Sequence, residues 1–226
     1  MSSVYVGYPD YVQLMVEFDD GVLLTDAPPH RSKILIDWIA ANVGKPIKYV
    51  VPSHHHHDHA YGVGDYAKVG VKLVVPEVAR DFYSKVSNGD VEIVTYNQTH
   101  PFVVKDKNVQ FRSVWRDEAP HARDWSYGIA TAACPGKEDD VVVFNGDVWS
   151  PGAESAGDGL RWDTGYARQW LIGAVKDGLS ADAIVVGAHG SSTLGTTDVL
   201  QSLIDITGFA YPPLTVGDWK AGGAFC

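Results

Sequence analysis

The sequence is poor in cysteine and has no long apolar run. Only Cys134 and Cys226 occur in 226 residues, which is too few for a disulfide framework or a thiolate metal site. No apolar run approaches the roughly 18 residues that a membrane-spanning helix needs. The first residues also lack the basic start and apolar stretch of a signal peptide. We therefore expect a cytoplasmic protein with no membrane partner.

Basic residues are also scarce. The chain has 18 Lys and Arg residues against 28 Asp and Glu residues, a formal net charge of −10. Because phosphate binding needs a basic surface, this balance disfavours nucleic acid as a partner and leaves a small-molecule substrate. The composition is 45% hydrophobic and 20% charged, which is typical of a folded chain. The segment 150–159 is too short for a linker between domains, so we expect one domain over residues 1–226. Self-association into a homo-oligomer is left open.

Strand and helix patterns alternate at both ends of the chain and indicate an α/β fold. In the first half we expect strands at 12–17, 21–26, 47–51 and 71–75, and helices at 32–43, 60–67 and 76–86. In the second half we expect strands at 91–96, 101–104, 109–114, 127–133, 141–144 and 183–186, and helices at 166–175 and 197–206. Such alternation is typical of sheets covered by helices.

Histidine is unusually concentrated at one place. Five of nine histidines lie within residues 54–59, directly after the apolar strand 47–51. An expression tag does not fit this internal position, and a chance surface cluster is the remaining alternative. Imidazole nitrogens suit zinc and other first-row metals. In an extended segment residues i and i+2 point the same way, so His54 and His56 can share one metal.

The residues that follow extend this interpretation. At the start of the next helix, Asp58 and His59 can turn toward a second metal, while His55 and His57 face elsewhere. Further ligands must come from other strand ends, because such ends converge on one edge of an α/β sheet. Three later residues lie at or just after predicted strands and offer ligand atoms: His121, Asp147 and His189.

These motifs together resemble the metallo-β-lactamase superfamily over about residues 12 to 190. The run His54-x-His56-x-Asp58-His59 matches the HxHxDH signature of that family. His121, Gly146-Asp147 and Gly187-Ala188-His189-Gly190 match its later ligand positions in order, and Leu23-Leu24-Thr25-Asp26 resembles its early Leu-Ile-Asp turn. The resemblance implies a four-layered αβ/βα sandwich with a two-metal site at one edge. Since the family usually has more strand before residue 12, we expect an edge strand to be missing or supplied by a partner.

The resemblance also implies a ligand set. His54, His56 and His121 would hold the first metal, Asp58, His59 and His189 the second, and Asp147 would bridge both. The context Pro120-His121-Ala122 departs from the Gly-His-Thr of many relatives, which leaves His100 as an alternative ligand. Asp26 matches a buried aspartate that supports the metal loop. Two Zn²⁺ ions are implied, with Fe or Mn as alternatives, because no cysteine lies at a ligand position.

The implied chemistry is hydrolysis. Two metals can share a water, lower its pKa and present a bridging hydroxide to an activated carbonyl compound such as a lactone, thioester or ester. Asp58 is the candidate catalytic residue, because it could steer this nucleophile or shuttle a proton. A bridging aspartate is typical of lactonase- and thioesterase-like relatives. The alternatives are a β-lactam hydrolase, a mononuclear iron dioxygenase and a non-catalytic metal-binding member of the fold.

Three residues are candidate substrate contacts from their positions in the sequence. Trp149 follows Asp147, Tyr61 follows the signature, and Arg123 follows His121. Each aromatic has a plain alternative, which is packing in the core or at the rim. Arg123 could meet an anionic substrate or pair with Asp124.

Overall fold

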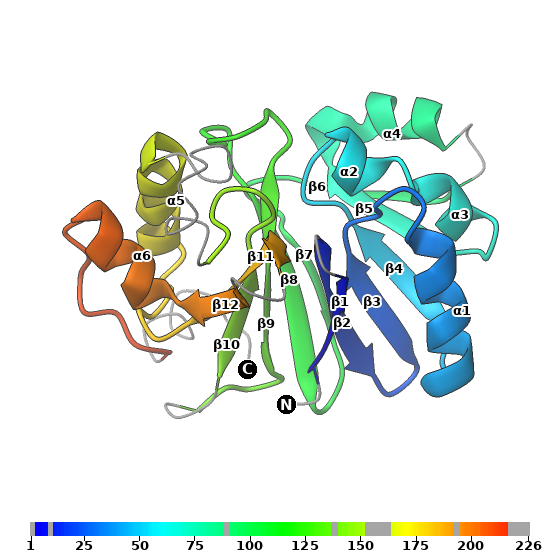
Figure 1. Ribbon diagram of the computed structural model, residues 1–226, viewed down its shortest axis with the longest axis horizontal. Helices are drawn as coiled ribbons and strands as arrows, with labels where there is room; N and C mark the ends of the chain where they lie inside the picture. Colours follow the sequence, from blue (N-terminus) through cyan, green and yellow to red (C-terminus); the bar gives the residue numbers. More distant parts are fainter. Residues whose placement is uncertain are drawn as a thin grey trace.

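The computed structural model describes residues 3–8, 11–87, 91–136, 140–151, 164–191 and 195–216. Two six-stranded sheets lie against each other, with helices on both outer faces (Figure 1). The first sheet contains β1 (Ser3–Tyr8), β2 (Tyr11–Phe18), β3 (Gly21–Thr25), β4 (Ile47–Val51), β5 (Lys72–Pro76) and β6 (Ile93–Tyr96), in that order. Strands β1 to β3 are antiparallel, and β3 to β6 are parallel.

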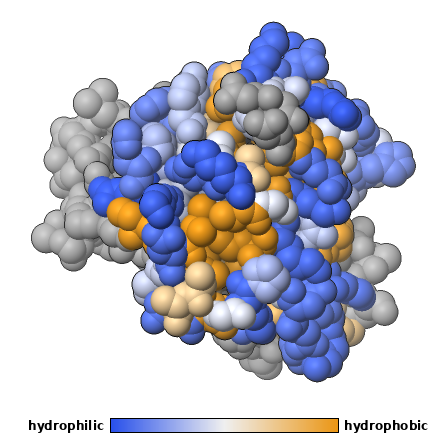
Figure 2. Space-filling view, turned by 90° about the vertical axis from the view of Figure 1, so that its right-hand side faces the viewer, coloured by the Kyte–Doolittle hydropathy of each residue, from blue (hydrophilic) through white to orange (hydrophobic). Residues whose placement is uncertain are grey.

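Parallel strands need crossover connections, and helices provide them here. The helices that follow the parallel strands are α1 (Ser32–Asn42), α2 (His57–Ala60), α3 (Val63–Ala67) and α4 (Arg80–Val86), with the 3₁₀ turn η1 (Glu77–Ala79). They cover the outer face of the first sheet, and this side of the molecule shows an apolar area among polar residues (Figure 2). On α1, Ile34 and Trp38 are exposed.

The second sheet has the order β12-β11-β10-β9-β8-β7. Its strands are β7 (Phe102–Lys105), β8 (Val109–Trp115), β9 (Ser126–Ala132), β10 (Val141–Phe144), β11 (Ile184–Ser191) and β12 (Gly195–Val199). Helices α5 (Thr164–Lys176) and α6 (Leu200–Thr207) cover its outer face (Figure 1). Of its pairs, β10 with β11 is parallel and the others are antiparallel. The four layers confirm the expected αβ/βα sandwich.

Three apolar cores hold the layers together. Leu14, Leu23, Phe111 and Phe144 are fully buried in the core that lies between the sheets. The other two cores lie under the helices, one on each side. Strand β2 contacts β8 and β11 across the sandwich. Burial of this kind stabilises by roughly 25 cal/mol per Å² of apolar surface, so the sheets are held in a defined mutual position.

Three details of the structure differ from the sequence expectations. The chain itself supplies an edge strand, because β1 pairs with β2 from Ser3–Val16 to Tyr8–Tyr11, so the expectation that it was missing or came from a partner is wrong. Residues 197–199, where the sequence predicts the start of a helix, belong to β12, since pairing with β11 satisfies their backbone groups. Cys134 is disulfide-bonded, so a low cysteine count excludes a framework but not a single bond. Among the described helices, none is long and apolar enough to cross a bilayer.

Candidate metal centre

The predicted ligands come from strand ends in both sheets. In the first sheet, Asp26 follows β3, and the segment 52–56 follows β4 and leads into α2. In the second sheet, Asp147 follows β10 and His189 lies near the end of β11. Because β10 and β11 run parallel, as do β3 and β4, their carboxyl ends meet at one edge of each sheet.

One group of side chains contains His54, His56, His121 and Asp147. Each offers one ligand atom, and these atoms lie within 4.8 Å of one another. Nε2 of His121 lies 3.2 Å from Nδ1 of His56 and 3.5 Å from Oδ2 of Asp147. Nε2 of His54 lies 3.7 Å from the same carboxylate oxygen. Such a cluster of three imidazoles and a carboxylate has the donor set of a zinc site.

A second group contains Asp58, His59, Asp147 and His189, again with ligand atoms within 4.8 Å. Nε2 of His59 and Nε2 of His189 lie 2.9 Å and 3.0 Å from Oδ1 of Asp147. Nε2 of His189 is also 3.1 Å from Oδ2 of Asp58. Asp147 therefore faces one group with each of its oxygens. These are the two ligand sets that the sequence resemblance implies, and metal binding by them remains a prediction.

The atoms in these groups fit a cation. Nε2 of His54, Nε2 of His59 and Oδ1 of Asp147 are buried and form no well-aligned hydrogen bond, although Nε2 of His59 lies 2.9 Å from Oδ1 of Asp147. Buried polar atoms normally have a partner, so a cation at this place would satisfy all three. The donors are nitrogen and oxygen only, which suits zinc and also iron or manganese. The residues present therefore fit the implied metals.

Asp26 orients one of the predicted ligands, His59. Its Oδ2 accepts hydrogen bonds from Nδ1 of His59 at 2.8 Å and from Oη of Tyr11 at 2.7 Å. Its Oδ1 accepts from the backbone N of Ser53 at 2.6 Å. With Nδ1 held in this way, Nε2 of His59 is directed toward Asp147. Asp26 has φ +59°, a left-handed conformation that aspartate tolerates better than most residues and that surrounding contacts must maintain.

Glycine is required beside the shared carboxylate. Gly146 has φ +58°, and a Cβ at this position would lie 2.8 Å from Oγ of Ser53. Both the left-handed backbone and the lack of space exclude a larger residue. The tight turn places Asp147 against the loop that carries His54, since Ser53 immediately precedes that histidine.

The electrostatic environment favours charged carboxylates and neutral imidazole at the first group. Burial raises the pKa of Asp147, but contacts with His121, His189 and His59 hold it well below the usual carboxyl range. Burial, followed by the charge of His59, lowers the pKa of His54 well below the usual histidine value. A neutral imidazole and an ionised carboxylate are the forms that bind metal.

The predicted substrate contacts have different environments. Tyr61 is 52% exposed, and its ring centroid lies 5.1 Å from that of His57. Arg123 is exposed, and its carbonyl oxygen accepts from Nε1 of Trp115 at 2.9 Å. Trp149 is fully buried in the core beneath α5 and α6, so its side chain has no surface for a substrate in this structure. The expectation for Trp149 is corrected, because packing under the outer helices takes its whole ring.

Sequence reasoning missed two residues at the site and kept one alternative that the structure removes. Tyr11, on β2, contacts Asp26 and lies edge-on to His189 at 5.3 Å between ring centroids. Tyr166, on the first turn of α5, is 39% exposed and lies 5.5 Å from the ring of His121. Neither tyrosine belongs to a sequence motif, so only its aromatic side chain could have marked it as a candidate site residue. His100 contacts Thr99 and belongs to neither of the two groups found among the described residues.

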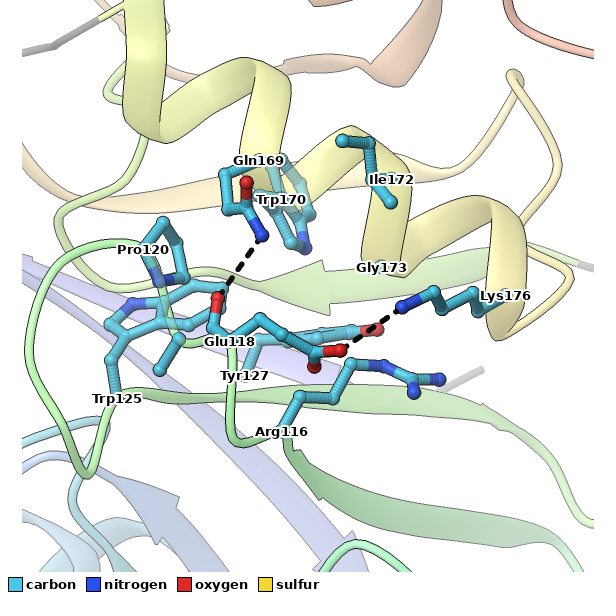
Figure 3. A pocket seen from close by; sticks show the side chains of 11 residues that line it. Arg116, Glu118, Pro120, Trp125, Tyr127, Gln169, Trp170, Ile172, Gly173 and Lys176 are labelled. Carbon is cyan, nitrogen blue, oxygen red and sulfur yellow. Dashed lines mark hydrogen bonds and ion pairs between the residues drawn. The ribbon is translucent and has the colours of Figure 1, made fainter.

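A separate pocket lies between α5 and residues 116–120 (Figure 3). None of its described lining residues belongs to either ligand group. The Nζ of Lys176 lies 3.3 Å from Oε1 of Glu118, and Nε2 of Gln169 donates to the Glu118 carbonyl at 3.4 Å. Arg116 forms an ion pair with Asp177. These contacts hold the segment before His121 against α5.

Comparisons with known proteins agree with this geometry. Residues 12–189 match the family model of the metallo-beta-lactamase superfamily. A metallo-beta-lactamase from Pontibacter korlensis aligns with a TM-score of 0.64 and 18% identity, over 91% of each chain. One from Hirschia baltica aligns with a TM-score of 0.62 and 17% identity, over 94% of this chain and 93% of that chain. Identities this low establish the fold alone, and no curated protein matches the sequence.

The family match spans every residue of the two ligand groups, from His54 to His189. The HxHxDH run and Asp147, which both groups share, lie within the matched residues. The chain therefore belongs to the metallo-β-lactamase superfamily.

Proposed function

We propose that this protein is a metal-dependent hydrolase that cleaves an activated carbonyl compound, namely a lactone, a thioester or an ester. The observation that carries the proposal is the position of Asp147, whose two oxygens face two separate groups of histidines. A carboxylate shared in this way suits two cations at close spacing. We expect Zn²⁺ in both positions, with Fe or Mn as alternatives.

The bound cations would supply Lewis acidity toward a carbonyl oxygen and would make a nearby water more acidic. The chain's own residues set the geometry for this chemistry. His54 and His59 are fully buried and held at their Nδ1 atoms, so their Nε2 atoms are fixed in direction. Asp58 is 44% exposed, and its pKa is held well below the usual range by His189 and His59. An ionised, partly exposed carboxylate can accept a hydrogen bond from an attacking water and orient it.

The positions of two exposed aromatic residues favour a substrate that carries an apolar group. Tyr61 directly follows α2 on the side of the first sheet, and Tyr166 lies in the first turn of α5 on the side of the second. Each packs against a histidine of the site region, Tyr61 on His57 and Tyr166 on His121. Exposed aromatic rings lose water favourably when an apolar group covers them. We therefore favour substrates with an acyl chain or ring beside the reacting carbonyl.

A panel of substrates tests the proposal. The protein is loaded with Zn²⁺, Mn²⁺ or Fe²⁺ and assayed for kcat/KM on acyl lactones, acyl thioesters, aryl esters and a chromogenic β-lactam. We expect turnover of at least one carbonyl class and its loss in His56→Ala and Asp147→Ala. Hydrolysis of the β-lactam alone would favour a β-lactam hydrolase, whose name several structural relatives carry. Full metal binding with no turnover would support a non-catalytic member, and full activity in both variants would disprove the assigned site.

A further inference from the structure

His55 lies between two predicted ligands, and its side chain contacts a residue far along the chain. Its Nδ1 lies 2.6 Å from Oδ1 of Asp124. A carboxylate can only accept, so the imidazole N–H donates in this hydrogen bond. Asp124 is 4% exposed, and the side chain of His55 is 43% exposed. The expectation that His55 merely faces away from the metals is therefore incomplete.

The contact joins the two loops that supply the three histidines of the first ligand group. His55 precedes His56 in the loop after β4, and Asp124 follows His121 by three residues in the loop before β9. These loops belong to different sheets. A backbone hydrogen bond also connects the two sheets here, because the N of Ser126 donates to the carbonyl oxygen of Ser53 at 2.7 Å. The side-chain bond is thus part of a cross-connection between the sheets at the ligand level.

Packing restricts the position of the His55 ring. Its centroid lies 5.1 Å from that of His56 and 5.4 Å from that of Phe82, both at steep angles. Asp124 depends on this partner, because its Oδ2 is buried and has no hydrogen-bond partner. A buried carboxylate that loses its remaining partner is unfavourable, so the pair resists separation. The ring is therefore held on three sides, by Asp124, His56 and Phe82.

We propose that His55 and Asp124 are positioning residues that hold the loop of His56 against the loop of His121, so that the first ligand group closes around its cation. Neither residue would ligate the metal. The inference rests on the metal binding of the proposed function and not on hydrolysis. The second group does not depend on this pair, because Asp26 holds His59 separately and His189 is part of β11.

The test is metal binding by the full chain, measured with Co²⁺ absorption spectra, chelator competition and metal analysis. We expect His55→Ala and Asp124→Ala to lower the affinity of the first group about 10- to 100-fold, as removal of groups that orient ligands does. Affinity at the second group should change less than about twofold. His57→Ala is the matched control, since His57 is exposed at the start of α2, two residues after His55, and belongs to neither group. A His189→Ala background, which keeps the first group whole, separates the two sites.

Conservative variants distinguish positioning from general support of the fold. The side-chain amide of Asn can place a donor near the position of Nδ1, so His55→Asn should restore most of the affinity that His55→Ala loses. Asp124→Asn keeps an acceptor oxygen and serves if Asp124→Ala does not fold. The double variant His55→Ala with Asp124→Ala should be no worse than either single variant.

Three results would overturn the inference. These are wild-type affinity at both groups in His55→Ala, an equal loss at both groups, and failure of His55→Asn to restore binding. The proposed function is judged separately. Two-site binding by the wild type without turnover removes the hydrolase and leaves the inference standing, whereas a wild type that binds no metal contradicts both.

Discussion

Oδ2 of Asp26 lies 2.8 Å from Nδ1 of His59, and both side chains are fully buried. The same oxygen accepts from Oη of Tyr11, and the other oxygen accepts from the backbone N of Ser53. One carboxylate thus fixes a ligand of the second group and the start of the loop that carries the first. These contacts help to maintain the left-handed backbone conformation of Asp26.

The first prediction is that Asp26→Ala weakens metal binding and the fold together. The variant leaves the backbone N of Ser53 without its acceptor, at about 1–3 kcal/mol for a buried group. It also removes one of the two partners of Tyr11 Oη, the other being Nδ1 of His59. Metal affinity should fall about 10- to 100-fold, because Nδ1 of His59 loses its carboxylate partner and keeps only the hydroxyls of Tyr11 and Ser53. Urea unfolding and chelator competition measure the two effects. Asp37→Ala, at an exposed ion pair with Lys33 on α1, should leave both values unchanged, and a similar effect in the two variants would refute the role of Asp26.

The second prediction concerns removal of metal. The buried atoms Nε2 of His54, Nε2 of His59 and Oδ1 of Asp147 need a partner, so the loaded protein should be the more stable form. At a free metal concentration of a hundred times Kd, binding adds about 2.7 kcal/mol, which corresponds to roughly 5–10 °C in Tm for a chain of this size. Thermal unfolding with Zn²⁺ and with a chelator measures the difference. Asp147→Ala should lose most of the shift, and an unchanged shift in that variant would place the metal elsewhere.

The third prediction uses two glycines at the start of α3. A Cβ on Gly62 would lie 2.1 Å from Oγ of Ser32 and 2.7 Å from the carbonyl oxygen of Ala27. Gly62→Ala must therefore displace backbone and should cost about 1–3 kcal/mol or more. At Gly64 nothing lies within 4 Å of a Cβ, so Gly64→Ala should stabilise by about 0.5–1 kcal/mol through helix propensity. Chemical denaturation measures the free energy of unfolding of both variants. Equal changes in the two variants would contradict the tight packing around Gly62.

The fourth prediction concerns the exposed ring of Tyr166 beside His121. If it covers an apolar part of the substrate, Tyr166→Ala should raise KM about 5- to 30-fold for long-acyl substrates, by roughly 1–2 kcal/mol of lost apolar contact. The KM of a short-acyl substrate should change much less. Tyr166→Phe keeps the ring and should resemble the wild type. Equal increases in KM for short and long acyl chains would show that Tyr166 does not contact the acyl group.

Much of the site was readable in the sequence because its signals are local. His54 and His56 are two apart in an extended segment, and Asp147 and His189 sit at apolar strand segments. These spacings act through backbone geometry, which holds in any fold that uses such strands. The resemblance to a family then ordered the ligands. Long strands and helices were predicted for the same reason, since apolar periodicity reflects burial directly.

Tertiary structure alone decided the contacts between distant segments. His55 reaches Asp124 across 69 positions, and Tyr11 reaches His59 across 48, and no periodic pattern records such pairs. The same holds for Trp149, whose burial depends on how the outer helices cover the second sheet. The sequence by itself determined which atoms can bind metal and where strands end. Packing of the two sheets decided which side chains hold those atoms in place, because orientation depends on contacts that form only when both halves come together.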